Sequence, residues 1–404
     1  MSTSLLYHAF GVRGYCYQRT EYDGGMVLFH MEPADKMVCC SVCGSRNVLR
    51  RGSKERWFRS LPIGSRLTWV IANIPRVQCR DCHEVRQIKI GFAEPRRTYT
   101  NAWARYALEL SRTMTIKDAA AALGVTWDVV KEIKKTYLKK HFSKPSLKDV
   151  THIAIDEICI GSGHRYLTIV IDWATGAVLF VGEGKSGDAL VPFWRRLKRS
   201  RTRIEAVAMD MSTAYIQAVE THLPNAAIVF DHFHVVKLMN EKLTALRRDL
   251  YREACEQLGK DVLKGTRWLL LKNPENLNAE KDEPARLEEA LRLNAPLATA
   301  YYLKEELRQF WEQPSKAAAQ RFLNSWYDRA MSTGIKQLMT MARTLAARAF
   351  GLLAYFDHPI STGPLEGTNN KIKTMQRQAY GFRDKEFFKL SIYAIQQLKY
   401  ALVG

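Results

Sequence analysis

Three acidic residues, far apart in the 404-residue sequence, stand in settings that suit metal chemistry. Asp156 lies inside an apolar run typical of a buried strand, Asp210 ends another such run, and Glu366 lies near the start of an expected helix. A carboxylate in an apolar strand is costly to bury unless it shares a partner such as a divalent cation. Mg²⁺ prefers oxygen ligands and keeps waters and substrate phosphates in its shell. The three residues therefore predict a site for two Mg²⁺ or Mn²⁺ ions, an arrangement that serves phosphodiester chemistry.

Neighbouring acids and a histidine are further candidates for this site. Glu157 and Asp172 rank lower, because their strand positions point them away from it or into turns. Asp231 and His234 lie at the end of a further apolar run, near the same predicted edge of the sheet. His234 is expected to orient a scissile phosphate or to hold a carboxylate in place. The alternative is a histidine bonded to a backbone carbonyl at a strand end.

The expected helix that carries Glu366 also presents groups that suit a phosphate backbone. Asn370 and Lys373 follow Glu366 by four and seven residues, so the three side chains share one helix face. Lys371, Lys373 and Arg377 are predicted to hold backbone phosphates near the site. A glutamate near a helix N-terminus also occurs for capping and dipole reasons alone, so Glu366 by itself decides nothing.

Two Cys-x-x-Cys pairs, separated by 35 residues, predict a second kind of metal site. The four thiolates of Cys40, Cys43, Cys79 and Cys82 can surround one Zn²⁺ tetrahedrally. Four protein ligands leave the metal no open position, so a structural ion is expected rather than a catalytic one. Two unrelated reduced pairs and a disulfide scaffold are the alternatives, and the disulfide scaffold conflicts with the absence of a visible secretory signal.

The remaining cysteines are not expected to form a metal site of their own. Cys39 lies beside the first pair and could replace a neighbour as ligand, as could His83 beside the second pair. Cys16, Cys159 and Cys255 are isolated, and we expect them to be packing residues.

Positive charge is concentrated near these cysteines. The chain has a net charge of +20, and residues 36 to 150 alone contain 24 Lys and Arg against 9 Asp and Glu. A polyanion, with nucleic acid the first candidate, is the expected partner. A generally basic surface without such a partner is the alternative.

Within this basic region, residues 115–131 predict two short helices joined by a turn at Gly124, with Thr126 as N-cap of the second. The pattern is that of a helix-turn-helix, although similar pairs occur in proteins that never touch DNA. Lys131, Lys134 and Lys135 on the second helix are the predicted DNA contacts.

The elements that must position these residues change character along the chain. From residue 151, three strands in a meander are followed by helix, strand, helix and strand, which is the order of a ribonuclease-H-like mixed α/β sheet. In such a sheet the first and fourth strands are neighbours, so Asp156 and Asp210 would face each other. The predicted divisions are an N-terminal segment of unknown role (1–35), a zinc ribbon (36–95), a helix-turn-helix domain (96–150), the first part of the catalytic domain (151–235), a helical insertion (236–355) and the final part with Glu366 (356–404).

Composition excludes several classes of protein. Hydrophobic residues make up 47% and charged residues 25%, which is ordinary for a folded domain. No apolar run approaches the roughly 18–20 residues that cross a bilayer, so no membrane partner is expected. We expect a cytoplasmic location. Trp268, in the expected insertion, is interpreted as a core residue, with stacking on an unpaired base as the alternative.

Together the motifs resemble the DDE transposases of bacterial insertion sequences, specifically the ISL-three group. The resemblance covers the chain from about residue 38 to 400, and it is carried by residues 40–43, 79–82, 155–157, 209–212, 231–234, 363–373 and 379–382. In this family a zinc ribbon and a helix-turn-helix bind terminal inverted repeats, and a ribonuclease-H-like domain with a helical insertion cuts and joins DNA. The resemblance implies that Asp156, Asp210 and Glu366 match the DDE triad. Asp231 and His234 match a D-x-x-H element shared with the Mutator and hAT groups.

The resemblance also implies an activity and its partners. Water would cut at the end of the element, and the freed 3′-hydroxyl would attack a phosphodiester in target DNA. Because two DNA ends must be brought together, a homodimer or larger assembly on double-stranded DNA is expected, in a bacterial cytoplasm at the nucleoid. Two other functions stay open: a catalytically inactive DNA-binding regulator, and a structure-selective nuclease of the same fold.

Overall fold

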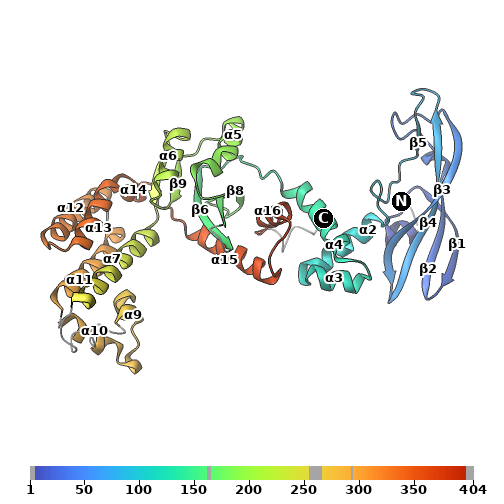
Figure 1. Cartoon of the computed structure of the whole chain (residues 1–404). Coiled ribbons are helices and arrows are strands. Elements are labelled where there is room, and N and C mark those ends of the chain that lie inside the picture. Colours follow the sequence, from blue (N-terminus) through green and yellow to red (C-terminus); the bar gives the residue numbers. More distant parts are fainter. Residues whose placement is uncertain (1–4, 162–164, 254–265, 293, 397–404) are drawn as a thin grey trace. The chain divides into compact units, whose positions relative to one another are not determined.

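The computed structural model describes residues 5–161, 165–253, 266–292 and 294–396, and the chain forms two compact units (Figure 1). The described part of the first unit ends at His141, and the second unit runs from Phe142 to Gln396. Each unit is built around its own five-stranded sheet. Among the described residues, no helix is both long and apolar enough to cross a membrane.

The sheet of the first unit has the strand order β1-β2-β4-β3, with β5 paired to β4. A single apolar core that includes Phe58, Val70 and Ile74 supports it. The elements of this part are α1 (Leu5–Phe10), β1 (Tyr15–Asp23), β2 (Met26–Pro33), the 3-10 turn η1 (Asp35–Met37), β3 (Val48–Ile63), β4 (Arg66–Cys79) and β5 (Val85–Gln87).

The described part of residues 1–35, a segment to which the sequence assigned no role, forms regular structure. β1 and β2 form an antiparallel hairpin that turns at Gly24 and Gly25, both with positive φ, and β2 then pairs in parallel with β4. Because no side chain of β1 is fully buried, the strand shows no clear alternation of buried apolar and exposed polar residues. The two glycines after Asp23 were the available signal, since such turns join hairpin strands.

Two prolines lie within the strands of this module without interrupting them. β3 runs through Pro62 to Ile63, and β4 continues through Pro75. Pro75 lies opposite Ser53, next to a shift in register between Arg50 and Ser53, and a proline is tolerated at such a bulge. The long β3–β4 hairpin therefore accounts for the 35 residues between the two cysteine pairs.

Three helices complete the first unit and form the expected helix-turn-helix. The first helix of the pair begins after Thr115, whose side chain accepts a hydrogen bond from the Asp118 N–H. The same helix ends at Gly124, which has a φ of +62°. Arg59 of β3 donates to the Leu123 carbonyl oxygen at 3.2 Å, which ties the helices to the sheet. The helices are α2 (Asn101–Thr113), α3 (Ile116–Leu123) and α4 (Trp127–Phe142).

The sheet of the second unit confirms the ribonuclease-H-like prediction. Its order is β10-β9-β6-β7-β8, in which β6, β7 and β8 form an antiparallel meander and β9 and β10 run parallel to β6. The first and fourth strands in sequence are thus neighbours. The strands are β6 (His152–Gly161), β7 (Arg165–Asp172), β8 (Val178–Glu183), β9 (Ala206–Met209) and β10 (Ala227–Phe230).

Helices cover both faces of this sheet (Figure 1). Large side chains of β6 and β9, such as Ile155 and Met209, join the core under α5 (Val191–Ser200) and α6 (Thr213–His222). The opposite face of the same strands carries the small residues Ala154, Ala206 and Ala208. There α15 (Gly363–Gln378) and α16 (Lys385–Tyr393) pack, and the small residues allow α15 to lie close to β6. The 3-10 turn η2 (Gly187–Leu190) precedes α5.

The sheet is interrupted between β10 and α15 by helices, as predicted. They share one apolar core with the α5 and α6 side of the sheet. Lys304 is buried within them, and its Nζ donates to the carbonyl oxygens of Leu270 at 2.9 Å and Lys272 at 3.1 Å. The helices are α7 (His232–Glu253), α9 (Arg267–Leu271), α10 (Glu283–Arg292), α11 (Ala295–Arg308), α12 (Lys316–Ser332), α13 (Lys336–Ala347) and α14 (Ala349–Leu353), with 3-10 turns at Pro274–Asn276, Ala279–Lys281, Gln309–Glu312 and Ala354–Phe356.

Trp268 is not the core residue that we expected. Its side chain is 64% exposed, and the Arg267 guanidinium lies 4.7 Å from the ring centroid. The next two residues, Leu269 and Leu270, occupy the buried side of the short helix α9, which leaves the tryptophan facing outward.

Candidate active site and zinc centre

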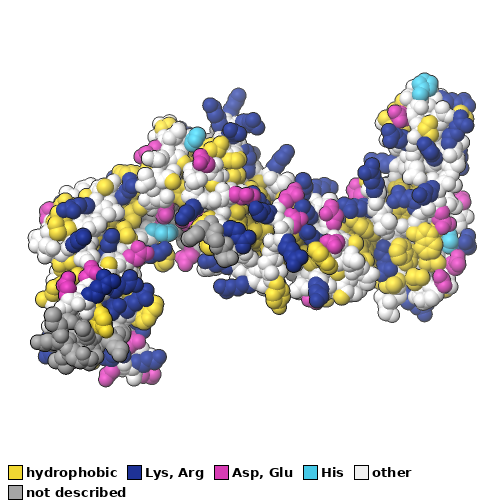
Figure 2. Space-filling view, in the orientation of Figure 1, with side chains coloured by type: hydrophobic (Ala, Val, Ile, Leu, Met, Phe, Trp, Pro, Cys, Tyr) yellow, Lys and Arg dark blue, Asp and Glu magenta, His cyan; other side chains and the backbone are white. Residues whose placement is uncertain are grey.

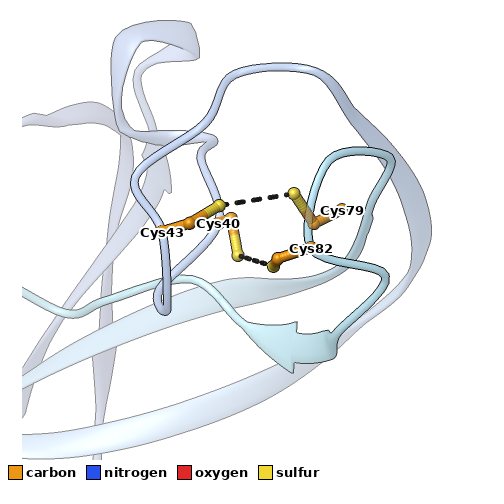
Figure 3. A group of neighbouring side chains, drawn as sticks. All are labelled: Cys40, Cys43, Cys79 and Cys82. Atoms are coloured by element: carbon orange, nitrogen blue, oxygen red, sulfur yellow. Dashed lines mark hydrogen bonds between the residues drawn. The ribbon is translucent and has the colours of Figure 1, made fainter.

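Four cysteine side chains converge in the first unit (Figure 3). One pair lies in the loop before β3, and the other lies at the end of β4 and in the turn that follows. All four sulfur atoms lie within 4.8 Å of one another. The Sγ atoms of Cys40 and Cys82 are 3.5 Å apart, and those of Cys43 and Cys79 are 3.6 Å apart.

These distances fit one tetrahedral Zn²⁺. A Zn–S distance of about 2.3 Å places two sulfurs of a tetrahedron about 3.8 Å apart. Backbone N–H groups of Cys43 and Val42 lower the pKa of Cys40 to about 7, which favours the thiolate that zinc requires. Gly44, with a φ of +77°, provides the tight turn after the first pair. The geometry supports a closed structural site with no position for a substrate.

The isolated cysteines do not behave as expected. Cys16 and Cys159 are exposed, so the interpretation of these two as packing residues is wrong. Both lie on strands with one face toward solvent, and cysteine alone does not reveal which face it takes. Cys255 lies outside the described residues.

The second site is built on the neighbouring strands β6 and β9. Ala154 is paired with Ala208 in their parallel register, and the residues two positions further along are Asp156 and Asp210. Strand side chains alternate between faces, so Asp156 lies on the alanine-lined face that α15 covers. Asp210 directly follows the last residue of β9, its Oδ1 accepts a hydrogen bond from the Ser212 N–H, and its charge acts on Asp156. The structure therefore brings these two predicted carboxylates together.

Asp156 lies in a crowded and partly dehydrated position. Burial, together with the negative charges of Glu157 and Asp210, raises the pKa of Asp156 to about 6. Its Oδ1 accepts a hydrogen bond from the Glu157 N–H at 2.8 Å, and its Oδ2 accepts one from Nδ2 of Asn369 at 3.0 Å. Repulsion between the carboxylates is the kind of energetic cost that a bound cation removes.

Asn369 is the residue of this site that sequence reasoning missed. Its side chain is buried, and its Oδ1 accepts no hydrogen bond from the described residues. An amide oxygen without a donor, on a side chain bonded to the Asp156 carboxylate, is a suitable ligand for a hard cation. Asn369 also anchors α15 to β6, and it lies three residues, or about one helical turn, after Glu366.

Glu366 lies in the exposed first turn of α15. Among the residues that the structure describes, only the four cysteines form a group of three or more potential ligands close enough to share an ion. The three acids thus do not converge as tightly as the cysteines. Carboxylates repel one another, and one Asp156 oxygen accepts a hydrogen bond from Asn369.

The competing acids have different surroundings. Burial and the charge of Asp210 raise the pKa of Glu157, which places this side chain nearer to the site than its strand position suggested. Asp172 accepts hydrogen bonds from the Ala174 N–H and the Thr175 hydroxyl. It therefore belongs to the turn after β7, as expected.

Asp231 and His234 meet at the junction of β10 and α7. Nδ1 of His234 and Oδ2 of Asp231 are 3.1 Å apart, and the Thr362 N–H donates to Oδ1 of Asp231 at 3.2 Å. Burial opposes ionisation of Asp231, but the bonds from His234 and Thr362 lower its pKa overall. The bond to Asp231 raises the pKa of His234, with further contributions from the charges of Asp156 and Asp210. Asp231 therefore fixes the residue just before α15, and His234 faces the acidic site.

The remaining predicted residues of α15 are exposed: Asn370, Lys371, Lys373 and Arg377. With Glu366 they run along the outer side of the helix. Lys371 donates to Oε1 of Gln396 at 2.7 Å, so its ammonium group already has a partner within the second unit.

The three lysines predicted to contact DNA lie on α4, the second helix of the helix-turn-helix. Nζ of Lys131 is 5.5 Å from the ring centroid of Trp127. Lys134 donates to the Ser111 carbonyl oxygen of α2 at 3.4 Å, and burial lowers its pKa. Lys134 thus helps to hold α2 against α4. Lys131 and Lys135 are half-buried, and their DNA contact stays a prediction.

Sequence reasoning overlooked a basic surface on the second unit. Figure 2 shows Lys and Arg side chains gathered over α5 at the top of the view. The exposed basic residues on α5 and the loop after it are Arg195, Lys198, Arg199, Arg201 and Arg203. Arg196 of the same helix differs, because it donates to the carbonyl oxygens of Leu179 and Pro145.

Family models match three stretches of the chain. Residues 36–82 match the zinc finger of transposase IS204/IS1001/IS1096/IS1165, and residues 88–137 match the helix-turn-helix domain of transposase family ISL3. Residues 153–392, more than half of the chain, match the ISL3 model described as a transposase.

Similar proteins are found along nearly the whole length. The chain is 34% identical, over 396 residues, to the transposase for insertion sequence element IS1001 of Bordetella parapertussis, covering 95% of this chain and 96% of the relative. It is 27% identical, over 390 residues, to the transposase for IS1557 of Mycobacterium tuberculosis, covering 90% and 87%. A Drosophila P element transposase strand transfer complex aligns with a TM-score of 0.42 and 11% identity over 75% of this chain and 93% of that one.

Proposed function

Because the chain belongs to the ISL3 family of insertion-sequence transposases, we propose that it binds the terminal inverted repeats of its element and catalyses Mg²⁺-dependent cleavage and transfer of DNA strands. One observation carries the catalytic part of this proposal. Asp156 and Asp210 lie two residues beyond the Ala154–Ala208 pair of β6 and β9, and Asn369 fixes the turn of α15 that carries Glu366 against Asp156.

Asp156, Asp210 and Glu366 are proposed to hold two Mg²⁺ or Mn²⁺ ions, with the free oxygen of Asn369 as a further ligand. When bound, such ions activate the attacking oxygen and stabilise the leaving one in phosphodiester chemistry. The protein contributes by positioning. Asn369 orients Asp156, and the partial exposure of Asp210 and Glu366 leaves room for a DNA strand. No covalent protein intermediate is needed for an in-line displacement.

Asp231 and His234 are proposed to support this site rather than to hold ions. Asp231 is buried and bonded to His234 and Thr362, so it places the start of α15. Its charge, with those of Asp156 and Asp210, favours a protonated His234 that can orient a phosphate near the reacting position. In this arrangement Asp231 acts through its neighbours, and only His234 would touch the DNA.

DNA contacts are proposed for both units. In the first, Lys131 and Lys135 of α4 would contact the repeat, and Lys134 would mainly support the helix. In the second, Asn370, Lys373 and Arg377 of α15 would contact backbone phosphates, and Lys371 would do so only by leaving Gln396. One zinc ion in the cysteine cluster would hold the β3–β4 hairpin ends together. A dimer or larger assembly is expected, because two DNA ends take part.

The test is a cleavage and joining assay with labelled duplexes that end in the repeats of the protein's own element. With Mg²⁺ or Mn²⁺ we expect a nick that frees a 3′-hydroxyl at the repeat end, and joining of that end to a second duplex. Random duplex should compete at least about tenfold less well than repeat DNA, because base contacts add to phosphate contacts. Glu366→Gln should retain binding and lose both products.

Three outcomes would contradict the proposal. Repeat binding without any cleavage would favour a DNA-binding regulator. Cleavage that depends on junctions or hybrids, and not on the repeat sequence, would favour a structure-selective nuclease. Full activity in Glu366→Gln would remove this residue from the site.

A further inference from the structure

Helix α15 ends in an unusual way at Tyr380. The Gly381 N–H bonds the Gln376 carbonyl oxygen at 2.9 Å, and the Tyr380 N–H bonds the Arg377 carbonyl oxygen at 3.0 Å. This pair of bonds is a Schellman motif, in which the first residue after the helix cap adopts a left-handed conformation. Glycine usually occupies that position, with asparagine next. Here Tyr380 occupies it, with a φ of +50°.

The left-handed conformation is strained for a tyrosine, because its Cβ lies too close to the backbone. Glycine at this position would close the helix without that strain. Strained residues persist where the surrounding structure holds them, and they are frequent at binding sites. The helix end therefore does not explain why a large aromatic residue stands here.

Packing does not explain it either. The Tyr380 side chain is 99% exposed, the highest value among the large hydrophobic residues of the described chain. Two residues later, Phe382 behaves as expected for the loop before α16 and stacks on Phe388 with ring centroids 4.6 Å apart. The loop is thus anchored by Phe382, while Tyr380 points away from the protein. An aromatic ring that is fully exposed on a strained backbone position suits a contact made outside the chain.

The position of Tyr380 relates it to the proposed active site. Glu366, Asn370, Lys373 and Arg377 recur every three or four residues along the exposed side of α15, and Tyr380 continues the series. The twelve residue steps from Glu366 to the last helical residue, Gln378, correspond to about 18 Å of helix. That length equals about five steps of a DNA strand at about 3.4 Å each. DNA that follows α15 would reach Tyr380 about five nucleotides from the reacting phosphate.

The charges around Tyr380 indicate the partner. Lys373, Arg377 and Arg383 surround it in sequence and suit a polyanion. The carboxylate of Asp384 is used within the chain, where it accepts the Phe387 N–H as the N-cap of α16. The hydroxyl of a tyrosine can donate to a phosphate, and its ring offers a surface for a nucleobase, where stacking tolerates any sequence. An exposed ring beside several cations, which already serve the phosphates, is best used for stacking.

We propose that Tyr380 stacks on an unpaired or unstacked nucleobase of the element end, about five nucleotides from the phosphate that reacts at Asp156, Asp210 and Glu366. The inference rests on the proposed transposase activity and adds a contact that holds the DNA strand along α15. The α15–α16 loop would then mark the far end of the DNA path on this face of the catalytic domain (Figure 1).

The test is photo-crosslinking with 5-iododeoxyuridine, which reacts with an aromatic ring stacked on it. Duplexes that end in the element's repeats carry this base at single positions from two to nine nucleotides from the cleaved bond. The full-length protein should crosslink through Tyr380, identified by peptide mass, at one or two adjacent positions. Tyr380→Gly should lower the yield there at least tenfold, and Tyr380→Phe should retain it, because the ring is kept.

Two controls separate contact from folding. Tyr302→Ala removes a similarly exposed ring from α11, far in sequence from α15, and should leave the crosslink unchanged. Tyr380→Gly relieves the left-handed strain, so its Tm should be unchanged or up to about 3 °C higher. A marked fall in Tm would mean that Tyr380 serves the fold and would overturn the inference.

The outcomes distinguish this inference from the activity on which it rests. Equal crosslinking by Tyr380→Gly at every position, in a protein that binds and cuts repeat ends, overturns the stacking contact alone. Loss of oligomers in Tyr380→Gly with the crosslink intact also overturns it, because the ring would then contact another protein copy. Failure of the unmodified protein to bind or cut repeat ends overturns the proposed function, and the stacking contact with it.

Discussion

The cysteine cluster of the first unit and the acidic site of the second unit are both candidate metal centres, but they are assembled differently. The four sulfurs already lie within 4.8 Å of one another, at distances suited to one ion. The carboxylates meet less closely, and Glu366 lies on an exposed helix turn. A structural metal needs all its ligands from the protein, whereas a catalytic one must leave positions for water and substrate. The difference indicates which site shapes the fold and which performs chemistry.

Both sites bring together groups that would carry like charges. Backbone N–H groups lower the pKa of Cys40, whereas the neighbouring thiols raise the pKa of Cys43, and burial with the neighbouring thiols raises that of Cys82. Burial and like charges likewise raise the pKa of Asp156. A cation would relieve repulsion at either site, so the two sites differ in how closely their ligands already meet.

The largest effect that tests this comparison is expected at Asp210. Asp210→Asn removes one ion ligand, and strand cleavage in Mg²⁺ should fall by about 10³-fold or more because charge stabilisation in the transition state is lost. Binding of repeat ends, measured by gel shift, should stay within a few-fold. Asp172→Asn, on the same sheet but within a turn, should keep its cleavage rate. Normal cleavage by Asp210→Asn would remove the assignment.

Loss of a cysteine should act on the fold instead of the chemistry. Cys40→Ser should release the zinc and unfold the ends of the β3–β4 hairpin, and specific end binding should weaken at least about tenfold, because structural zinc contributes folding free energy directly. Zinc content by mass spectrometry and Tm of the first unit are the measurements. The exposed Cys16 offers a matched control, since Cys16→Ser should retain one zinc. Purified protein without zinc would contradict the structural role.

A smaller effect is expected at the contact that joins α15 to the acids. Asn369→Ala removes the bond to Asp156, and cleavage should fall by about 10–100-fold, the usual result of disturbing a group that orients a metal ligand. The Mn²⁺ concentration at half-maximal cleavage should rise as well. Thr374→Ala, which removes an exposed hydroxyl of the same helix, is the control. An unchanged Mn²⁺ requirement would argue that Asn369 serves packing only.

The smallest effect concerns backbone contacts near the acidic site. Lys373→Ala should weaken binding similarly for repeat and random DNA, and it should lower the slope of log affinity against log salt by about 0.9, as expected for one phosphate contact. Titration between low and moderate salt measures the slope. A slope identical to that of the unmodified protein would place Lys373 away from the DNA.

The acidic pair could be predicted from sequence because strand order alone makes the first and fourth strands neighbours. Asp156 and Asp210 each follow an apolar run, and the pattern of three meander strands sets their adjacency. Asn369 could not be chosen over Asn370, because both adjacent residues suit the motif and only the packing of α15 decides which one faces β6. The buried Asn369 contacts Asp156, and Asn370 is exposed.

Exposed elements were predicted less well than buried ones. β1 lacks an apolar face that would mark a strand. Trp268 is a large apolar residue of the kind usually found in a core, but in α9 the two leucines that follow it occupy the buried side. The basic residues on α5 and after it could not be distinguished by sequence from the generally high positive charge of the chain. In each case the missing information is which side of an element meets the rest of the fold, and local sequence does not contain it.

The bond between Asp231 and the Thr362 N–H joins residues that stand 131 positions apart, on either side of the inserted helices. The two ends of the insertion are therefore held side by side, directly before the helix that carries Glu366. Since the inserted helices also share an apolar core with the α5 and α6 side of the sheet, the insertion and the acidic site belong to one packed unit. A change in the length or packing of those helices would act on the start of α15 through this junction.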